Sequence, residues 1–162
     1  MPKLLKIEPD KCTGCMQCEL ACSWVKTGAF QPAMSLIKVH VLDEEACYVP
    51  HVCYQCDEAW CMTACPVNAI AINPDTGAKV VLSELCVGCG LCALTCPFGT
   101  IFIRPADRKA VKCDLCGGDP ACVKICPTDC IKYEEAVEPA SWLEPLARQV
   151  TEAYQQAASA EV

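Results

Sequence analysis

The sequence has little positive charge. Its 13 lysines and arginines stand against 20 aspartates and glutamates, which gives a formal net charge of −7. This balance argues against nucleic-acid binding, which needs a basic surface. No stretch approaches the roughly 20 apolar residues of a membrane span. No basic segment followed by a long apolar run opens the sequence, so we also expect no secretory signal. These absences predict a cytoplasmic protein whose thiols stay reduced.

Large apolar side chains are also scarce once cysteine is set aside. The hydrophobic fraction of 53% includes 18 cysteines, and only 6% of the residues are aromatic. A core built from side chains alone would be thin, so we expect buried metal groups to take its place. The two histidines, His40 and His51, stand apart in the sequence without an acid–base partner. We expect structural or surface roles for both, and no catalytic site.

Sixteen of the eighteen cysteines fall into four groups of four. Groups one and three follow C-x2-C-x2-C-x3-C, while the middle gap has four residues in group two and five in group four. The groups are Cys12, Cys15, Cys18 and Cys22; Cys53, Cys56, Cys61 and Cys65; Cys86, Cys89, Cys92 and Cys96; and Cys113, Cys116, Cys122 and Cys126. Pro66, Pro97 and Pro127 follow the last cysteine of groups two to four, and Ser23 takes that place in group one. An internal repeat of this kind is the main indication of the fold in this sequence.

Three kinds of site compete for these groups. Two C-x2-C pairs can hold zinc tetrahedrally, but zinc does not need the full four-cysteine pattern with its trailing prolines. Disulfides do not suit C-x2-C spacing repeated four times in a chain whose thiols are reduced. Iron–sulfur clusters fit best. Three close cysteines reach three irons of one cubane, and the fourth, about one helical turn further on, points toward another cluster. The spacing leaves open which groups exchange their fourth cysteines.

The segments between the groups predict short strands. Residues 70–72 and 79–82 read as a hairpin around a turn at 73–77. Residues 100–103 and 130–133 read as strands after groups three and four, and the alternation over 36–42 suggests one more hairpin.

The last part of the sequence differs from the rest. From Ser141, a plausible N-cap with Glu144 at the capping-box position, it reads as an amphipathic helix. We expect this tail, residues 138–162, to pack on its own domain, on a partner or on another copy of the chain.

The stretch CYQCDEAWCMTACPVNAIAINPDTGAKVVLSELCVGCGLCALTCPFG resembles the four-cluster iron–sulfur subunits of molybdenum and tungsten enzymes of the dimethyl-sulfoxide-reductase type. The resemblance covers about residues 3–135. It implies an α+β fold with two ferredoxin-like bicluster units, in which short β-hairpins and helices surround pairs of [4Fe–4S] clusters. Groups one and four would form one unit and groups two and three the other, within a domain of residues 1–137.

The resemblance also implies the ligands of four [4Fe–4S] clusters. Each set joins three cysteines of one group to the fourth of another. The implied sets are Cys12, Cys15 and Cys18 with Cys126; Cys113, Cys116 and Cys122 with Cys22; Cys53, Cys56 and Cys61 with Cys96; and Cys86, Cys89 and Cys92 with Cys65. Cys47 and Cys130 fall outside the groups, and we expect both to pack as small apolar residues.

A further implication is a non-catalytic electron-transfer subunit. Its partner would be a large tungsten- or molybdenum-pterin subunit, with aldehyde oxidoreductase as the preferred class, and its acceptor a flavin subunit or another redox protein. Two alternatives remain open. One is the subunit of a formate dehydrogenase or hydrogenase complex, and the other is a free-standing polyferredoxin that shuttles electrons.

Overall fold

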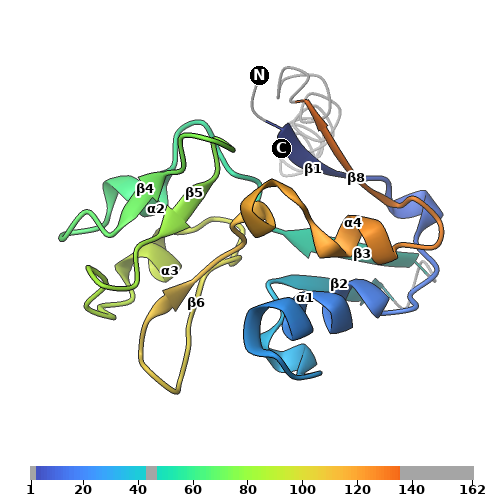
Figure 1. Ribbon diagram of the computed structural model, residues 1–162, viewed down its shortest axis with the longest axis horizontal. Helices are drawn as coiled ribbons and strands as arrows, with labels where there is room; N and C mark the ends of the chain where they lie inside the picture. The colour runs from blue at the N-terminus through green and yellow to red at the C-terminus, as the bar shows by residue number, and fades with distance from the viewer. Residues whose placement is uncertain (1–2, 43–46, 136–162) are drawn as a thin grey trace, which may run out of the picture.

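A computed structural model describes residues 3–42 and 47–135 of the chain, so the tail helix predicted from Ser141 lies outside the described residues. The described part is an α+β structure of short elements arranged in two lobes (Figure 1). In chain order, the elements are β1 (Lys3–Ile7), η1 (Pro9–Lys11), α1 (Gln17–Thr27), η2 (Pro32–Met34), β2 (Ile37–Leu42), β3 (Cys47–Val52), α2 (Trp60–Thr63), β4 (Ile70–Ile72), β5 (Lys79–Val81), α3 (Leu91–Thr95), β6 (Phe102–Ile103), β7 (Ala110–Val111), η3 (Leu115–Gly118), α4 (Ala121–Ile125) and β8 (Ile131–Glu135). None of the described helices has the length and apolarity needed to cross a membrane.

The strands pair into small antiparallel sheets: β1 with β8, β2 with β3, β4 with β5, and β6 with β7. The hairpin predicted over 70–82 is confirmed, and Ile70 lies opposite Val81 in it. The hairpin suggested by residues 36–42 is confirmed as β2 with its partner β3. The strand predicted over 100–103 is present as the shorter β6, and the strand predicted over 130–133 corresponds to β8. Local alternation therefore identified most of the strands, but no pattern in the sequence predicted β1 or β7.

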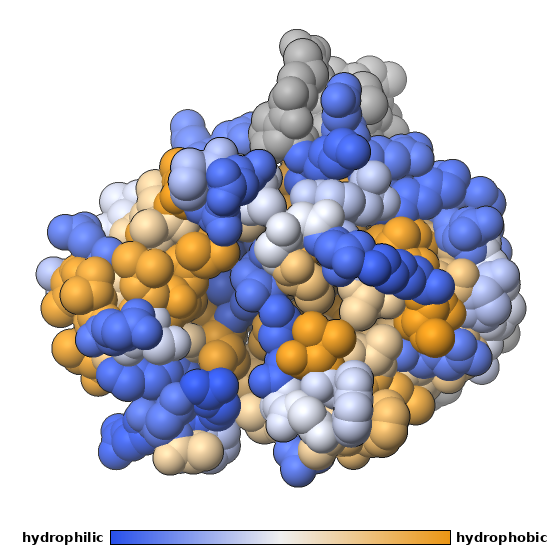
Figure 2. Space-filling view, viewed as in Figure 1, coloured by the Kyte–Doolittle hydropathy of each residue, from blue (hydrophilic) through white to orange (hydrophobic). Residues whose placement is uncertain are grey.

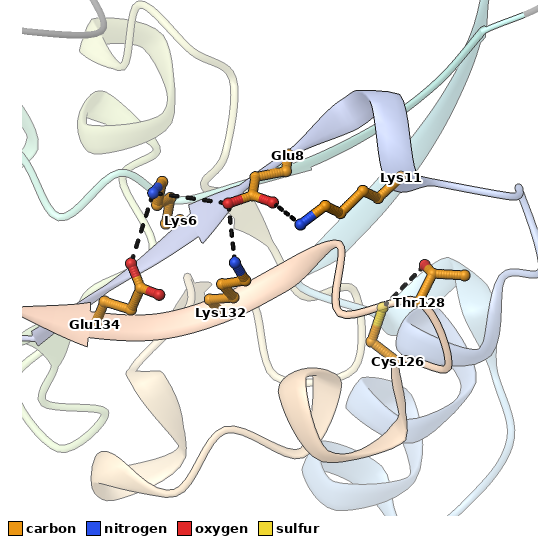
Figure 3. A network of polar contacts seen from close by, with 7 residues as sticks. All are labelled: Lys6, Glu8, Lys11, Cys126, Thr128, Lys132 and Glu134. Carbon is orange, nitrogen blue, oxygen red and sulfur yellow. Dashed lines mark hydrogen bonds and ion pairs between the residues drawn. The ribbon is translucent and has the colours of Figure 1, made fainter.

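The β1–β8 sheet joins the two ends of the described chain, and a carboxylate at its edge is surrounded by lysines (Figure 3). Glu8 accepts a hydrogen bond from Lys11 and another of 3.0 Å from Lys132. Lys6 stands 3.6 Å from Glu8 and equally far from Glu134 on β8. The hydrogen bonds from Lys11 and Lys132 lower the pKa of Glu8 to about 2. This strand pairing brings group one, after β1, close to group four, before β8.

Each of the helices α1 to α4 begins next to a cysteine. The third cysteine of every group is the second residue of its helix: Cys18, Cys61, Cys92 and Cys122. Helices α3 and α4 end just before Cys96 and Cys126, whose ψ angles are 113° and 114°. A following proline forces this extended conformation. Group one has Ser23 in place of proline, and its helix α1 continues for 11 residues.

Two hydrophobic clusters form the interior, one in each lobe. The larger contains Ile37, Leu115 and Ile131 together with cysteines of groups one and four and with Cys53. The smaller contains Ile70 and Ile101 together with cysteines of groups two and three. Cysteines therefore make up much of both cores, as the scarcity of large apolar residues led us to expect.

Candidate iron–sulfur sites

Three separate pockets are each lined by four group cysteines in a three-plus-one arrangement. The first lies beside α3, the second beside η3 and α4, and the third beside η1 and α1. Their group cysteines are Cys86, Cys89 and Cys92 with Cys65; Cys113, Cys116 and Cys122 with Cys22; and Cys12, Cys15 and Cys18 with Cys126. In every case the lone cysteine comes from a different group.

Among the remaining four group cysteines, the charges of two act on the other two. Burial is the main cause of the raised pKa values of Cys56 and Cys61, and the charges of Cys53 and Cys96 add to it. Cys96, from group three, is therefore within electrostatic range of Cys56 and Cys61 of group two. The positive charge of Lys112 acts on Cys56 and Cys61 in the opposite direction and favours their thiolates.

The buried ligand candidates resist ionisation in the protein by itself. Burial raises the pKa of Cys18 and of Cys122 to about 12, and the charge of Cys22 adds to the effect at Cys122. The pKa of the buried Cys113 is raised as well, mainly by burial and further by the charges of Cys122 and Cys53. Thiolates packed this closely need positive charge among them, which cluster irons would supply. Assembly is therefore coupled to deprotonation of these thiols.

The fourth cysteines receive hydrogen bonds, which at Cys65, Cys96 and Cys126 come from the turns that follow them and at Cys22 from the segment after η2. The Sγ of Cys65 accepts from the backbone N–H of Ala69 at 3.2 Å, and the Sγ of Cys22 from that of Leu36 at 3.3 Å. Burial alone would raise the pKa of Cys96 and Cys126, but hydrogen bonds from the turns lower both. At Cys126 one partner is the Thr128 hydroxyl, 3.8 Å away (Figure 3). Donors aimed at sulfur stabilise a thiolate, the form that binds iron.

The donor sets suit a group with several irons. In a [4Fe–4S] cluster the protein holds the irons through cysteine thiolates, so four sulfurs can stand around a cubane without converging on one point. Within residues 3–42 and 47–135, no three His, Cys, Asp or Glu side chains are placed to hold a single metal ion. The three sets of cysteine thiols that are spread around pockets, rather than gathered at a point, fit a cubane cluster.

Exposure distinguishes the two ends of the molecule from its middle. Cys15 in group one and Cys89 in group three are exposed, whereas Cys53 and Cys113 are buried. Figure 2 shows apolar side chains gathered over the lobe of groups two and three. In the same lobe, Val87 is 65% exposed and Leu94, on α3, is 82% exposed. One candidate site therefore approaches the surface at each end of the protein.

The two histidines, treated above as separate residues, lie together in the structure. The register of the β2–β3 hairpin pairs Val39 with Pro50, which makes His40 and His51 diagonal neighbours. Their ring nitrogens are 3.3 Å apart. Among the described residues neither histidine has an ion pair with a carboxylate. The hairpin register, which brings the two rings together, was not readable from the sequence.

Cys130 lines the same pocket as Cys12, Cys15, Cys18 and Cys126, although it belongs to no group. It is 1% exposed, and burial is the main cause that raises its pKa to about 12, with the nearby charge of Cys12 contributing. A buried neutral thiol behaves as a small apolar residue.

Replacing Cys130 by alanine should therefore leave the iron content unchanged and cost about 1 kcal/mol or less of stability. Iron analysis of the purified variant checks this, with Cys126→Ala, from the same pocket, as the matched variant that should lose iron. Equal iron loss in the two variants would make Cys130 a ligand.

The family comparison agrees with this chemistry. Residues 44–136 match the 4Fe-4S dicluster domain, and residues 5–23 match the 4Fe-4S binding domain. The chain belongs to the 4Fe–4S dicluster family. It is an iron–sulfur protein, and the two matches together span all four cysteine groups. The family assignment supports [4Fe–4S] clusters as the groups that these cysteines bind.

Several relatives of this dicluster protein carry functional names. The polyferredoxin-like subunit of aliphatic sulfonate oxidoreductase from Pyrococcus furiosus is 46% identical over 120 residues, which cover 74% of this chain and 69% of the relative. Hydrogenase-4 component A from Escherichia coli is 35% identical, with 82% of each chain covered. The active-site complex BamBC of benzoyl-coenzyme A reductase superimposes over 99% of this chain and 97% of its own, with 25% identity and a TM-score of 0.47, an overlap too weak to establish a shared fold.

Proposed function

We propose that this protein is a non-catalytic electron-transfer subunit that carries four [4Fe–4S] clusters for an oxidoreductase. The observation that carries the proposal is the arrangement of cysteines, in which three pockets each gather three cysteines of one group with the fourth of another. Each bound [4Fe–4S] cluster would take up and release one electron. The protein's own side chains bury the sulfurs, direct N–H groups toward them and exclude water.

The proposed ligand sets follow the same arrangement. The pockets support Cys86, Cys89 and Cys92 with Cys65; Cys113, Cys116 and Cys122 with Cys22; and Cys12, Cys15 and Cys18 with Cys126. The charges of Cys53 and Cys96, which act on Cys56 and Cys61, support these four as the fourth set. Two bicluster units result, one in each lobe, within the proposed domain of residues 1–137. The tail of residues 138–162 would be a separate helical element.

The four sites would form a linear path. The two end sites contain the exposed Cys15 and Cys89, and the two middle sites contain the buried Cys113 and Cys53. The charge of Cys53 contributes to the raised pKa of Cys113, which supports electron transfer between the two middle sites. Electrons would then enter at one exposed end and leave at the other.

The proposed partner is a large tungsten- or molybdenum-pterin subunit, with aldehyde oxidoreductase as the preferred class. The family resemblance of the cysteine groups supports this partner, and the relatives named as subunits of a sulfonate oxidoreductase and a hydrogenase support membership of a larger complex. The second candidate is a free-standing polyferredoxin, which the polyferredoxin-like name of the Pyrococcus furiosus relative favours.

Anaerobic purification from the native organism tests both parts of the proposal. Iron and sulfide analysis should give about sixteen of each per chain, as four cubane clusters require. A subunit should remain bound to a large pterin-containing protein at high dilution, whereas a polyferredoxin should elute alone. About one zinc per cysteine group and no iron would contradict the cluster proposal, and an iron-replete chain free of partners would favour the polyferredoxin.

A further inference from the structure

Three long polar side chains are buried where the two lobes meet. Gln55 is 3% exposed, Lys112 is 5% exposed and Lys79 is 9% exposed. Gln55 lies in the link from β3 to α2, Lys112 in the link from β7 to η3, and Lys79 begins β5. Gln55 directly precedes Cys56, and Lys112 directly precedes Cys113. The three residues therefore stand beside the two middle sites of the proposed path.

Hydrogen bonds tie these residues into one network. Lys112 donates its Nζ to the side-chain oxygen of Gln55 at 3.2 Å and to the backbone oxygen of Lys79. The Nζ of Lys79 donates to the backbone oxygen of Gln55 at 2.9 Å, and its backbone N–H donates to the side-chain oxygen at 2.8 Å. The amide of Gln55 completes the network by donating to the backbone oxygen of Cys113 at 2.7 Å. Every acceptor in this network is neutral.

Within the described residues, neither buried lysine side chain is paired with a carboxylate. The ion pairs of the described residues include neither Lys79 nor Lys112. Burying a charged lysine is unfavourable unless an opposite charge compensates it. Cysteine sulfurs lie within electrostatic range of Lys112, because its charge acts on Cys56 and Cys61, while the carboxylate of Asp114, two residues further on, is paired with Lys26. The network is therefore expensive for the fold by itself and becomes favourable beside a negatively charged cluster.

We propose that Lys112, supported by Lys79 and oriented by Gln55, is an internal cation that raises the reduction potential of the cluster bound by Cys53, Cys56, Cys61 and Cys96. The inference rests on the proposed function, since it needs those four ligands. By formal charge counting, a [4Fe–4S] group with four thiolates carries about −2 when oxidised and about −3 when reduced. A fixed positive charge nearby stabilises the reduced form more than the oxidised form. The added electron is the only change in the step, and no bond is made or broken.

The position of the cation gives it a use in electron transfer. Gln55 and Lys112 lie in the links through which the chain passes between the two lobes that Figure 1 shows. Each directly precedes a cysteine of a proposed middle site, Cys56 or Cys113. A cluster there with a low potential would oppose electron entry from the neighbouring lobe. The buried lysines raise that reduction potential and so favour electron entry. They affect the outer clusters, at the exposed ends, less, because the interaction between charges weakens with distance.

Redox titration of the full chain with its clusters tests the proposal. Dithionite would serve as the reductant, electron paramagnetic resonance would follow each cluster, and the pH would be held constant. In Lys112→Gln, which keeps a hydrogen-bond donor but loses the charge, one cluster should become at least tenfold harder to reduce, about 59 mV for a one-electron couple. Lys79→Gln should shift the same cluster in the same direction.

Lys6→Gln is the matched control, because it removes the same charge from an exposed side chain on β1. It should leave all four potentials unchanged. An iron-replete Lys112→Gln protein with wild-type potentials would overturn the inference, as would an equal shift in the control. If Lys112→Gln loses iron, the Lys79→Gln protein is titrated in its place. Wild-type potentials in that variant, or an equal shift in the control, would then overturn the inference. Failure of the proposed function would give a different result from failure of this inference. The wild-type protein itself would then lack the expected content of about sixteen irons, or would lack four reducible clusters.

Discussion

Replacing Cys65 by alanine should damage the cluster held by Cys86, Cys89 and Cys92 and leave the cluster of group two intact. Cys65 belongs to group two by sequence, yet it lines the pocket of group three. Its Sγ accepts the N–H of Ala69 at 3.2 Å, which holds the sulfur in place on that side. Without this ligand, we expect the protein to lose between one iron and a whole cluster, so between about one and four of the sixteen irons.

The cleanest measurement compares spectra rather than iron alone. Cys89→Ala removes a ligand that group three itself supplies, and Cys61→Ala removes one from group two. The electron paramagnetic resonance spectrum of Cys65→Ala should lack the same signal as that of Cys89→Ala and keep the signal that Cys61→Ala loses. If the spectrum of Cys65→Ala matched that of Cys61→Ala instead, each group would keep its own fourth cysteine, and the proposed exchange of ligands would be wrong.

Gly88→Ala should be the most damaging change at a position that is not a cysteine. Gly88 lies between Cys86 and Cys89, with a φ of +71°, and an added Cβ would overlap the backbone oxygen of Arg108. The left-handed conformation costs about 1–2 kcal/mol for a residue with a side chain. Overpacking adds about 1–3 kcal/mol, because a backbone atom cannot move aside easily. We expect a clear fall in the temperature of unfolding and loss of the group three cluster.

Gly90 provides a matched control two residues away. Its φ of +81° is equally unfavourable for alanine, but nothing lies within 4 Å of the position that a Cβ would take. Gly90→Ala should therefore show only the conformational cost and retain its iron. Thermal unfolding and iron analysis of both variants separate the two effects. Equal damage in the two proteins would mean that backbone conformation, and not the contact with Arg108, limits this loop.

Features that depend on neighbouring residues were readable from the sequence. The strands β4 and β5 follow from an alternating pattern around a turn, since residues that face one side of a strand recur at every second position. The short helices α3 and α4 end where they do because proline follows Cys96 and Cys126. Ser23, in the place of such a proline, is the reason that α1 continues to Thr27.

Features that join distant parts of the chain were not readable in the same way. No local pattern marks β1, because its partner β8 lies more than 120 residues further along and pairs from Lys3 with Glu135 onward. The proximity of His40 and His51 depends on the register of one hairpin. The buried network of Gln55, Lys79 and Lys112 joins three separate segments, and each of these residues looks like an ordinary surface side chain in the sequence.

The sequence by itself determined the chemistry of this protein. The repeated groups require thiolate ligands for clusters, because cysteine spacing is a local property that the printed order of residues carries completely. Only the tertiary structure decided which cysteines share a pocket, which ends are exposed and where two lysines are buried. Those features depend on how strands and links far apart in the chain come together, and packing between distant segments leaves no periodic pattern in the sequence.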